Sequence, residues 1–95
     1  MSILIQFDQM MTIKLHQNFL KQYKKLRENE KKKFKERRNL FLQNEFSPIL
    51  NNHSLKGKYQ GFRSINVTGD LRIIYKKNND QALFVAIDSH SNLYG

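Results

Sequence analysis

Between residues 12 and 26 the apolar positions first follow the two-residue spacing of a strand and then the spacing of a helix. Residues 12–15 read Thr-Ile-Lys-Leu, an alternation that predicts a short strand. Phe19, Tyr23 and Leu26 then fall at the i, i+4 and i+7 positions of one helical face. This part of the chain therefore predicts a strand followed by an amphipathic helix.

A second helix is expected over roughly residues 30–44, after a break at Asn29. Phe34 and Phe41 are seven positions apart, which places them on one side of that helix. Pro48 ends the helical half, because proline cannot continue a helix.

The second half of the chain has the spacing of strands and turns. Alternating side chains predict a strand over residues 59–67, and Thr-Gly-Asp at 68–70 predicts a turn. A strand rich in β-forming residues follows at 71–77, with a second turn at 78–80. The nearly continuous apolar run at 82–87 predicts a central strand.

These elements predict an α+β fold of order β-α-α-β-β-β, with a mostly antiparallel four-stranded sheet, two helices on one face and the other face left open. Residues 89–94 would form a short turn or helical stub, completing a single domain over residues 12–95. Residues 1–11 are interpreted as an N-terminal extension, or as sequence upstream of the natural start codon. Alternation at Ile3, Ile5 and Phe7 would allow a strand there.

The net charge of +9 on 95 residues suggests a polyanionic partner such as nucleic acid or the ribosome. The charge is clustered, since residues 14–38 carry eleven Lys or Arg and three Glu. The absence of cysteine excludes disulfides and thiolate metal sites and fits a cytoplasmic protein. Apolar runs are too short for a membrane span or a signal peptide, so we expect no membrane partner.

Two histidines and an aspartate lie in the second half of the chain, at His53, Asp70 and His90, with Tyr94 four residues after the last. Two imidazoles could cut RNA without a metal, since one takes the 2′-hydroxyl proton while another acid protonates the leaving 5′-oxygen. Asp70 would orient a histidine or accept a proton, and Tyr94 would stack on a base or touch the phosphate.

Each of these residues also has a plain structural interpretation. His53 would be an ordinary loop histidine, Asp70 a turn residue, His90 a surface or capping residue, and Tyr94 an anchor for the C-terminus. Their sequence separations of 17 and 20 residues match no compact metal motif, so we expect no metal and no cofactor.

Basic side chains surround the candidate site in the sequence. Arg63 and Arg72 are expected to contact the phosphate in the transition state, because a guanidinium can grip two oxygens at once. Lys56 and Lys58 are expected to contact backbone phosphates.

Three sequence blocks in order resemble the RelE/YafQ toxin family. Residues 53–63 read His-x-Leu-x-Gly-x-x-x-Gly-Phe-Arg, residues 69–75 look like the following strand, and Ser-His-x-x-Leu-Tyr at 89–94 looks like the C-terminal end of the YafQ branch. The helical residues 19–26 match more loosely.

The resemblance implies the toxin of a bacterial type II toxin–antitoxin system, a metal-independent endoribonuclease that cuts mRNA in the ribosomal A site and leaves a 2′,3′-cyclic phosphate and a 5′-hydroxyl. The implied partners are a cognate antitoxin, mRNA and the ribosome, with operator DNA bound only through the antitoxin complex. Because only Gly95 follows Tyr94, we expect a C-terminal tag to weaken activity more than an N-terminal one.

Carried over by this resemblance, His53, Asp70, His90 and Tyr94 fall on catalytic positions of the YafQ branch. Ser64 stands where that branch often has an acid, and Asn66, an expected RNA contact, stands where it often has a further histidine. Two alternatives stay open: a non-enzymatic gyrase inhibitor of the ParE type on the same fold, and a catalytically weak RNA- or ribosome-binding protein.

Overall fold

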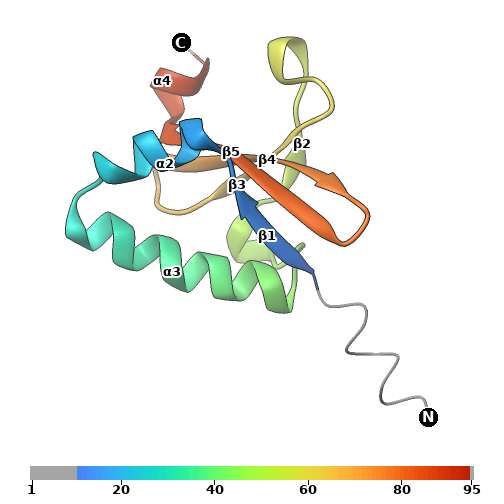
Figure 1. The fold of residues 1–95 in the computed structure, drawn as a ribbon, viewed down its shortest axis with the longest axis horizontal. Helices are drawn as coiled ribbons and strands as arrows, with labels where there is room; N and C mark the ends of the chain where they lie inside the picture. The colour runs from blue at the N-terminus through green and yellow to red at the C-terminus, as the bar shows by residue number, and fades with distance from the viewer. Residues whose placement is uncertain (1–10, 95) are drawn as a thin grey trace.

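A five-stranded sheet forms the centre of the protein (Figure 1). The structure is a computed structural model that describes residues 11–94. The strands lie in the order β1-β5-β4-β3-β2; β1 runs parallel to β5 and the other pairs are antiparallel. Their bounds are β1 (Thr12–Leu15), β2 (His53–Ser54), β3 (Arg63–Asn66), β4 (Leu71–Asn78) and β5 (Gln81–Ser89).

Three α-helices and two 3-10 turns complete the described chain. They are α2 (Gln17–Lys24), α3 (Glu28–Gln43), α4 (His90–Tyr94), η1 (Pro48–Leu50) and η2 (Gly57–Tyr59). None of the helices in residues 11–94 has the length and apolar character needed to cross a membrane.

The predicted break at Asn29 is wrong by two to four residues, because α3 already begins at Glu28. The main-chain N–H of Arg27 donates a 2.9 Å hydrogen bond to the Glu30 carboxylate, which satisfies a donor at the helix N-terminus. The break therefore falls at residues 25–27.

Helices α2 and α3 cover one face of the sheet, as predicted (Figure 1). Phe19 from α2 and Phe34 and Phe41 from α3 are buried against Phe84 of β5, with ring centroids 5.4–6.4 Å from that of Phe84. Tyr75 of β4 closes this aromatic core at 5.0 Å from Phe41. Aromatic burial of this kind is a large share of the stability of so small a domain.

The other face of the sheet is not left open, contrary to the prediction. Ile74, Ala86 and Leu93 are buried there, and four partly buried side chains pack on them. These are Leu55, Tyr59, Phe62 and Val85. The alternation of β4 and β5 gives this face apolar positions too, and α4 and the segment around η2 supply their cover.

The α+β class and the mostly antiparallel sheet are confirmed, but within residues 11–94 the sheet has five strands, not four. Strand β2 was missed because two residues are too few for an alternation pattern. The strand predicted over 59–67 begins only at Arg63, since the preceding Gly61 has a φ of +90°. The predicted extension at 1–11 lies, apart from Met11, outside the described residues; Met11 packs against the main core.

Candidate active site

A hollow of about 280 Å³ opens where β2, β3, β4 and α4 meet. It lies on the sheet face opposite α2 and α3. The side chains predicted for proton transfer and stacking, His53, His90 and Tyr94, all line it, as does Arg72. The remaining lining residues are Asn51, Leu55 and Ser64.

His53 is the first residue of β2, and its ring is held in one orientation. Its Nδ1 lies 2.8 Å from the carbonyl oxygen of Asn51. A carbonyl oxygen only accepts, so Nδ1 must carry the proton of this bond. In the neutral ring Nε2 is then the basic nitrogen. Asn51, which supplies this carbonyl oxygen, is in the left-handed region of the backbone (φ 46°).

His90 is the first residue of α4, at the point where β5 ends. Its main-chain N–H donates to Asp70, to the carbonyl oxygen at 2.9 Å and to Oδ1 at 3.3 Å. Its ring centroid lies 4.8 Å from that of Tyr94, one helical turn on. Within the described part of the chain no hydrogen bond engages the imidazole, so both nitrogens are available to a substrate.

Asp70 does not line the hollow. It lies in the turn between β3 and β4, on the far side of the His90 main chain, and borders a separate depression beside the α2–α3 connection. Its contact with the catalytic candidates is through the His90 backbone rather than through an imidazole.

Arg72 of β4 is held by the turn that precedes it. Its Nη1 donates to the carbonyl oxygens of Thr68 at 3.0 Å and Gly69 at 2.9 Å. Neither Nε nor Nη2 makes a hydrogen bond to another described residue. Three N–H groups of a fixed guanidinium are therefore left for an anion in the hollow.

Ser64 and Asn66 share one face of β3, and each contains a buried polar atom without a hydrogen-bond partner among the described residues. Ser64 is completely buried, directly opposite His53 in the β2–β3 pair, and its Oγ is the unpartnered atom. The equivalent atom in Asn66 is Oδ1, but Asn66 lies outside the lining of the hollow.

The structure does not bring Arg63 to the hollow. Arg63 has the same parity on β3 as the core residue Ile65, so it projects to the helix-covered face. There its Nε donates to Asn52 Oδ1 at 2.7 Å, and the guanidinium lies 5.3 Å from the Phe46 ring centroid.

Lys56 and Lys58 are exposed next to the hollow, in and just before η2. Lys58 Nζ lies 5.1 Å from the Tyr59 ring centroid, and the Tyr59 ring lies 6.1 Å from Tyr94. This row of one cation and two aromatic rings extends from the hollow along the surface, a combination suited to the phosphates and bases of a single strand.

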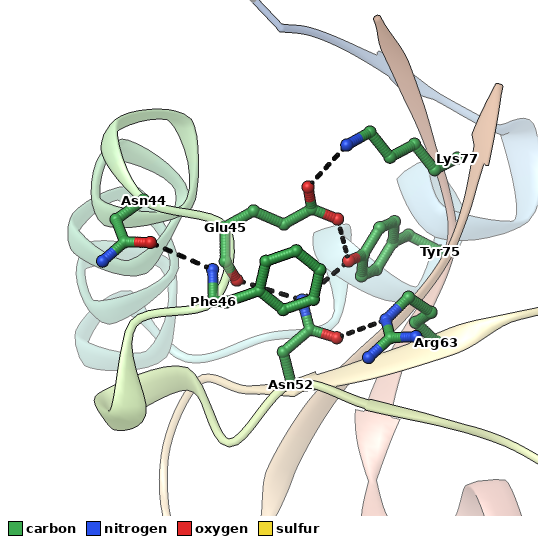
Figure 2. Close-up of polar contacts among 7 residues, drawn as sticks. All are labelled: Asn44, Glu45, Phe46, Asn52, Arg63, Tyr75 and Lys77. Carbon is green, nitrogen blue, oxygen red and sulfur yellow. Dashed lines mark hydrogen bonds and ion pairs between the residues drawn. The ribbon is translucent and has the colours of Figure 1, made fainter. Parts of the chain in front are cut away.

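Sequence reasoning missed a polar cluster behind His53, shown in Figure 2. Buried Glu45 accepts hydrogen bonds from Tyr75 Oη at 2.6 Å and Lys77 Nζ at 2.7 Å. Asn52 joins this cluster to Arg63. Burial, together with the bond to Glu45, raises the pKa of Tyr75 above its usual range, so its hydroxyl stays a donor. The only local indication in the sequence was the Asn51-Asn52 pair after the turn that begins at Pro48. Asparagine is common in turns because it tolerates the left-handed backbone region.

Within residues 11–94 no group of three or more His, Cys, Asp or Glu side chains lies close enough together to hold a metal ion. The side chains that line the hollow supply two imidazoles, a guanidinium and an aromatic ring.

Known structures share this fold. YafQ from E. coli superposes with a TM-score of 0.76 at 23% identity, covering 87% of this chain and 97% of that one. The E. coli DinJ–YafQ toxin–antitoxin complex gives 0.74 at 23% identity, covering 90% and 99%. A metal-bound toxin from Helicobacter pylori gives 0.67 at 26% identity, covering 90% and 100%.

No curated protein matches the chain by sequence. The family described as the bacterial toxin of type II toxin-antitoxin system, YafQ, matches residues 11–95, which is nearly the whole chain. The chain therefore belongs to the YafQ family of bacterial type II toxin–antitoxin toxins.

Proposed function

We propose that this toxin is a metal-independent endoribonuclease that cuts mRNA in the ribosomal A site. One observation carries the proposal: His53 and His90, 37 positions apart in the sequence, line the same hollow together with Arg72. Two imidazoles and a cation are the groups that phosphodiester cyclisation requires.

In the proposed reaction His53 Nε2 takes the proton of the 2′-hydroxyl. The 2′-oxygen then bonds to the adjacent phosphorus as the bond from phosphorus to the 5′-oxygen breaks. His90, in its protonated form, gives its proton to the leaving 5′-oxygen, so the products are a 2′,3′-cyclic phosphate and a 5′-hydroxyl. Arg72 stabilises the charge that builds on the phosphate oxygens.

The other residues take supporting roles in this proposal. Tyr94 stacks on a base, while Lys56 and Lys58 bind neighbouring phosphates. Asp70 and Arg63 act by holding His90 and the His53 loop rather than by touching RNA. Asn66, beside Arg72 in the β3–β4 pair, becomes an RNA contact only if bound RNA reaches beyond the hollow.

The proposed partners follow from the same reaction. The toxin acts in the cytoplasm on ribosome-bound mRNA, a cognate antitoxin protein holds it inactive, and operator DNA is bound only through the antitoxin complex. The DinJ–YafQ structure supports the antitoxin as a partner of the family.

Cleavage mapping tests the proposal. Purified toxin is mixed with mRNA in EDTA, with and without translating ribosomes, beside His53→Ala, His90→Ala and the matched control His16→Ala. His16 caps α2 through Asn18 and is not in the hollow, so its variant should cut normally. Ribosome-dependent cuts with cyclic phosphate ends that vanish in both hollow variants support the proposal. Intact mRNA in every lane, from folded protein, contradicts it and points to a non-enzymatic toxin.

A further inference from the structure

The cluster behind His53 lies on the helix-covered side of the sheet and fixes the side chain of Asn52 at every polar atom. Asn52 Nδ2 donates to Tyr75 Oη at 2.7 Å and to the Glu45 carbonyl oxygen at 3.0 Å, while Oδ1 accepts from Arg63 Nε at 2.7 Å (Figure 2). Both amide hydrogens and the amide oxygen are therefore used.

The directions of these bonds are consistent along the whole cluster. Tyr75 has one hydroxyl hydrogen, which it donates to the Glu45 carboxylate, so it must accept from Asn52. The amide of Asn52 consequently has one allowed orientation. A part-buried network that engages every polar atom of the Asn52 side chain rigidifies the segment that carries it.

Asn52 lies in the sequence between Asn51 and His53, the two residues of the contact that orients the imidazole. Asn51, on one side, supplies the carbonyl oxygen that meets His53 Nδ1 at 2.8 Å, and His53 itself follows on the other side. The strand that holds His53 has only two residues, and within residues 11–94 it pairs with β3 alone. So short a pairing fixes a side chain weakly by itself.

We propose that Asn52, anchored by Glu45, Tyr75 and Arg63, is a positioning residue that holds His53 in the Nδ1–H tautomer with Nε2 facing the hollow. Its catalytic consequence rests on the proposed ribonuclease function, whereas the tautomer itself is a property of the free toxin. Successive residues of an extended chain point to opposite faces, so Asn52 can bond to the cluster on the core face while His53 stays accessible to substrate on the other face.

The three histidines make a spectroscopic test possible. His16 Nδ1 accepts from the Asn18 main-chain N–H at 3.0 Å, so its proton must sit on Nε2. His53 has the opposite requirement. Long-range ¹H–¹⁵N spectra of the imidazole rings, recorded at a pH where the rings are neutral, should therefore show opposite nitrogen patterns for His16 and His53.

Two variants remove the anchor: Asn52→Ala, and Tyr75→Phe, which deletes one oxygen and keeps the ring. The matched control is Tyr23→Phe, on the α2 side of the core. In each anchor variant the two His53 nitrogen shifts should move toward each other, because the ring then exchanges between tautomers. Those of His16 should stay unchanged, as should every ring in the control. The proposal is overturned if the nitrogen shifts of His53 stay unchanged in a folded anchor variant. It is also overturned if His53 of the natural protein is not mainly in the Nδ1–H tautomer.

Kinetics then test the catalytic consequence. The anchor variants should lower kcat by about tenfold to a hundredfold with KM nearly unchanged, as expected for a misplaced base. If the natural toxin cuts no RNA, the proposed ribonuclease function is wrong. The nitrogen spectra still test whether Asn52 positions His53. Full kcat in a variant whose His53 tautomer has changed overturns the catalytic part.

Discussion

The main-chain N–H of His90 donates to the main-chain carbonyl oxygen of Asp70 at 2.9 Å, and Asp70 Oδ1 accepts a second, longer contact from the same N–H at 3.3 Å. This pair joins the turn between β3 and β4 to the first residue of α4. It sets where the helix starts, and with it where the His90 ring enters the hollow. Asp70 therefore reaches the candidate chemistry through the backbone.

This relationship separates two roles for Asp70. A positioning carboxylate can be replaced by an amide that keeps an oxygen acceptor, whereas a proton acceptor cannot. We expect Asp70→Asn to retain kcat within about threefold, because its amide oxygen can accept the same hydrogen bond. Asp70→Ala should lose about tenfold, since the loss of a hydrogen bond costs about 1.5 kcal/mol. Steady-state cleavage assays measure both. An Asn variant as inactive as the Ala variant would instead make Asp70 a proton-transfer group.

The aromatic core makes a prediction about stability. Phe84 is fully buried among Phe19, Phe34, Phe41 and Tyr75, so Phe84→Ala should lower the free energy of unfolding by about 3–5 kcal/mol. Urea denaturation followed by circular dichroism measures the loss. Phe46→Ala is the control, because that ring is 59% exposed, and it should cost about 1 kcal/mol or less. Similar losses in both variants would contradict the packing described.

The N-terminus of α3 makes a prediction about pH. The hydrogen bond from the Arg27 main-chain N–H, with the Arg27 side chain, lowers the pKa of Glu30 below its ordinary value of 4.5. A folded-state pKa below the unfolded one means that the stabilisation is present above about pH 4.5 and is lost as pH falls through the folded value.

Glu30→Ala should therefore cost about 1 kcal/mol of unfolding free energy at pH 7, and clearly less at pH 3. Denaturation of both proteins at the two pH values checks this. Glu28→Ala, at an exposed acid in the same turn, removes no comparable bond and should cost less at pH 7. A Glu30 effect that is equal at both pH values would rule out the ionised cap.

The sequence predicts much of the fold because its periodicities are long enough to be seen. The faces of α2 and α3 are marked by aromatic residues, and β4 and β5 are eight and nine residues long. Strand β2 has two residues and pairs only in the folded chain, so no local pattern can reveal it. The second apolar cluster, under α4, depends likewise on a distant segment covering Ile74.

In the candidate site, too, some residues were predicted from the sequence and others were not. His53, His90, Arg72 and Tyr94 were predicted from residue type and motif spacing, and the structure brings them to one hollow. Arg63 was predicted to contact the phosphate, but on β3 it has the same parity as the core residue Ile65 and so projects to the helix-covered face.

The anchor of His53 could not be predicted from sequence. Glu45, Asn52 and Tyr75 are separated by 7 and 23 positions and meet only after β4 has packed against the end of α3. A network with such separations has no sequence period, and each of its residues taken alone looks ordinary.

The fixed guanidinium of Arg72 makes a prediction about salt. If it neutralises one phosphate of a bound RNA strand, Arg72→Gln should weaken binding and reduce the slope of log affinity against log salt by about 0.7. Fluorescence anisotropy with a short RNA at several salt concentrations measures the slope. The matched control is Lys14→Gln, which makes the same charge change at exposed β1, on the opposite edge of the sheet from β2. It should leave the slope unchanged. Equal reductions in both variants would mean that RNA senses only the net charge of +9, and that the hollow does not hold the phosphate.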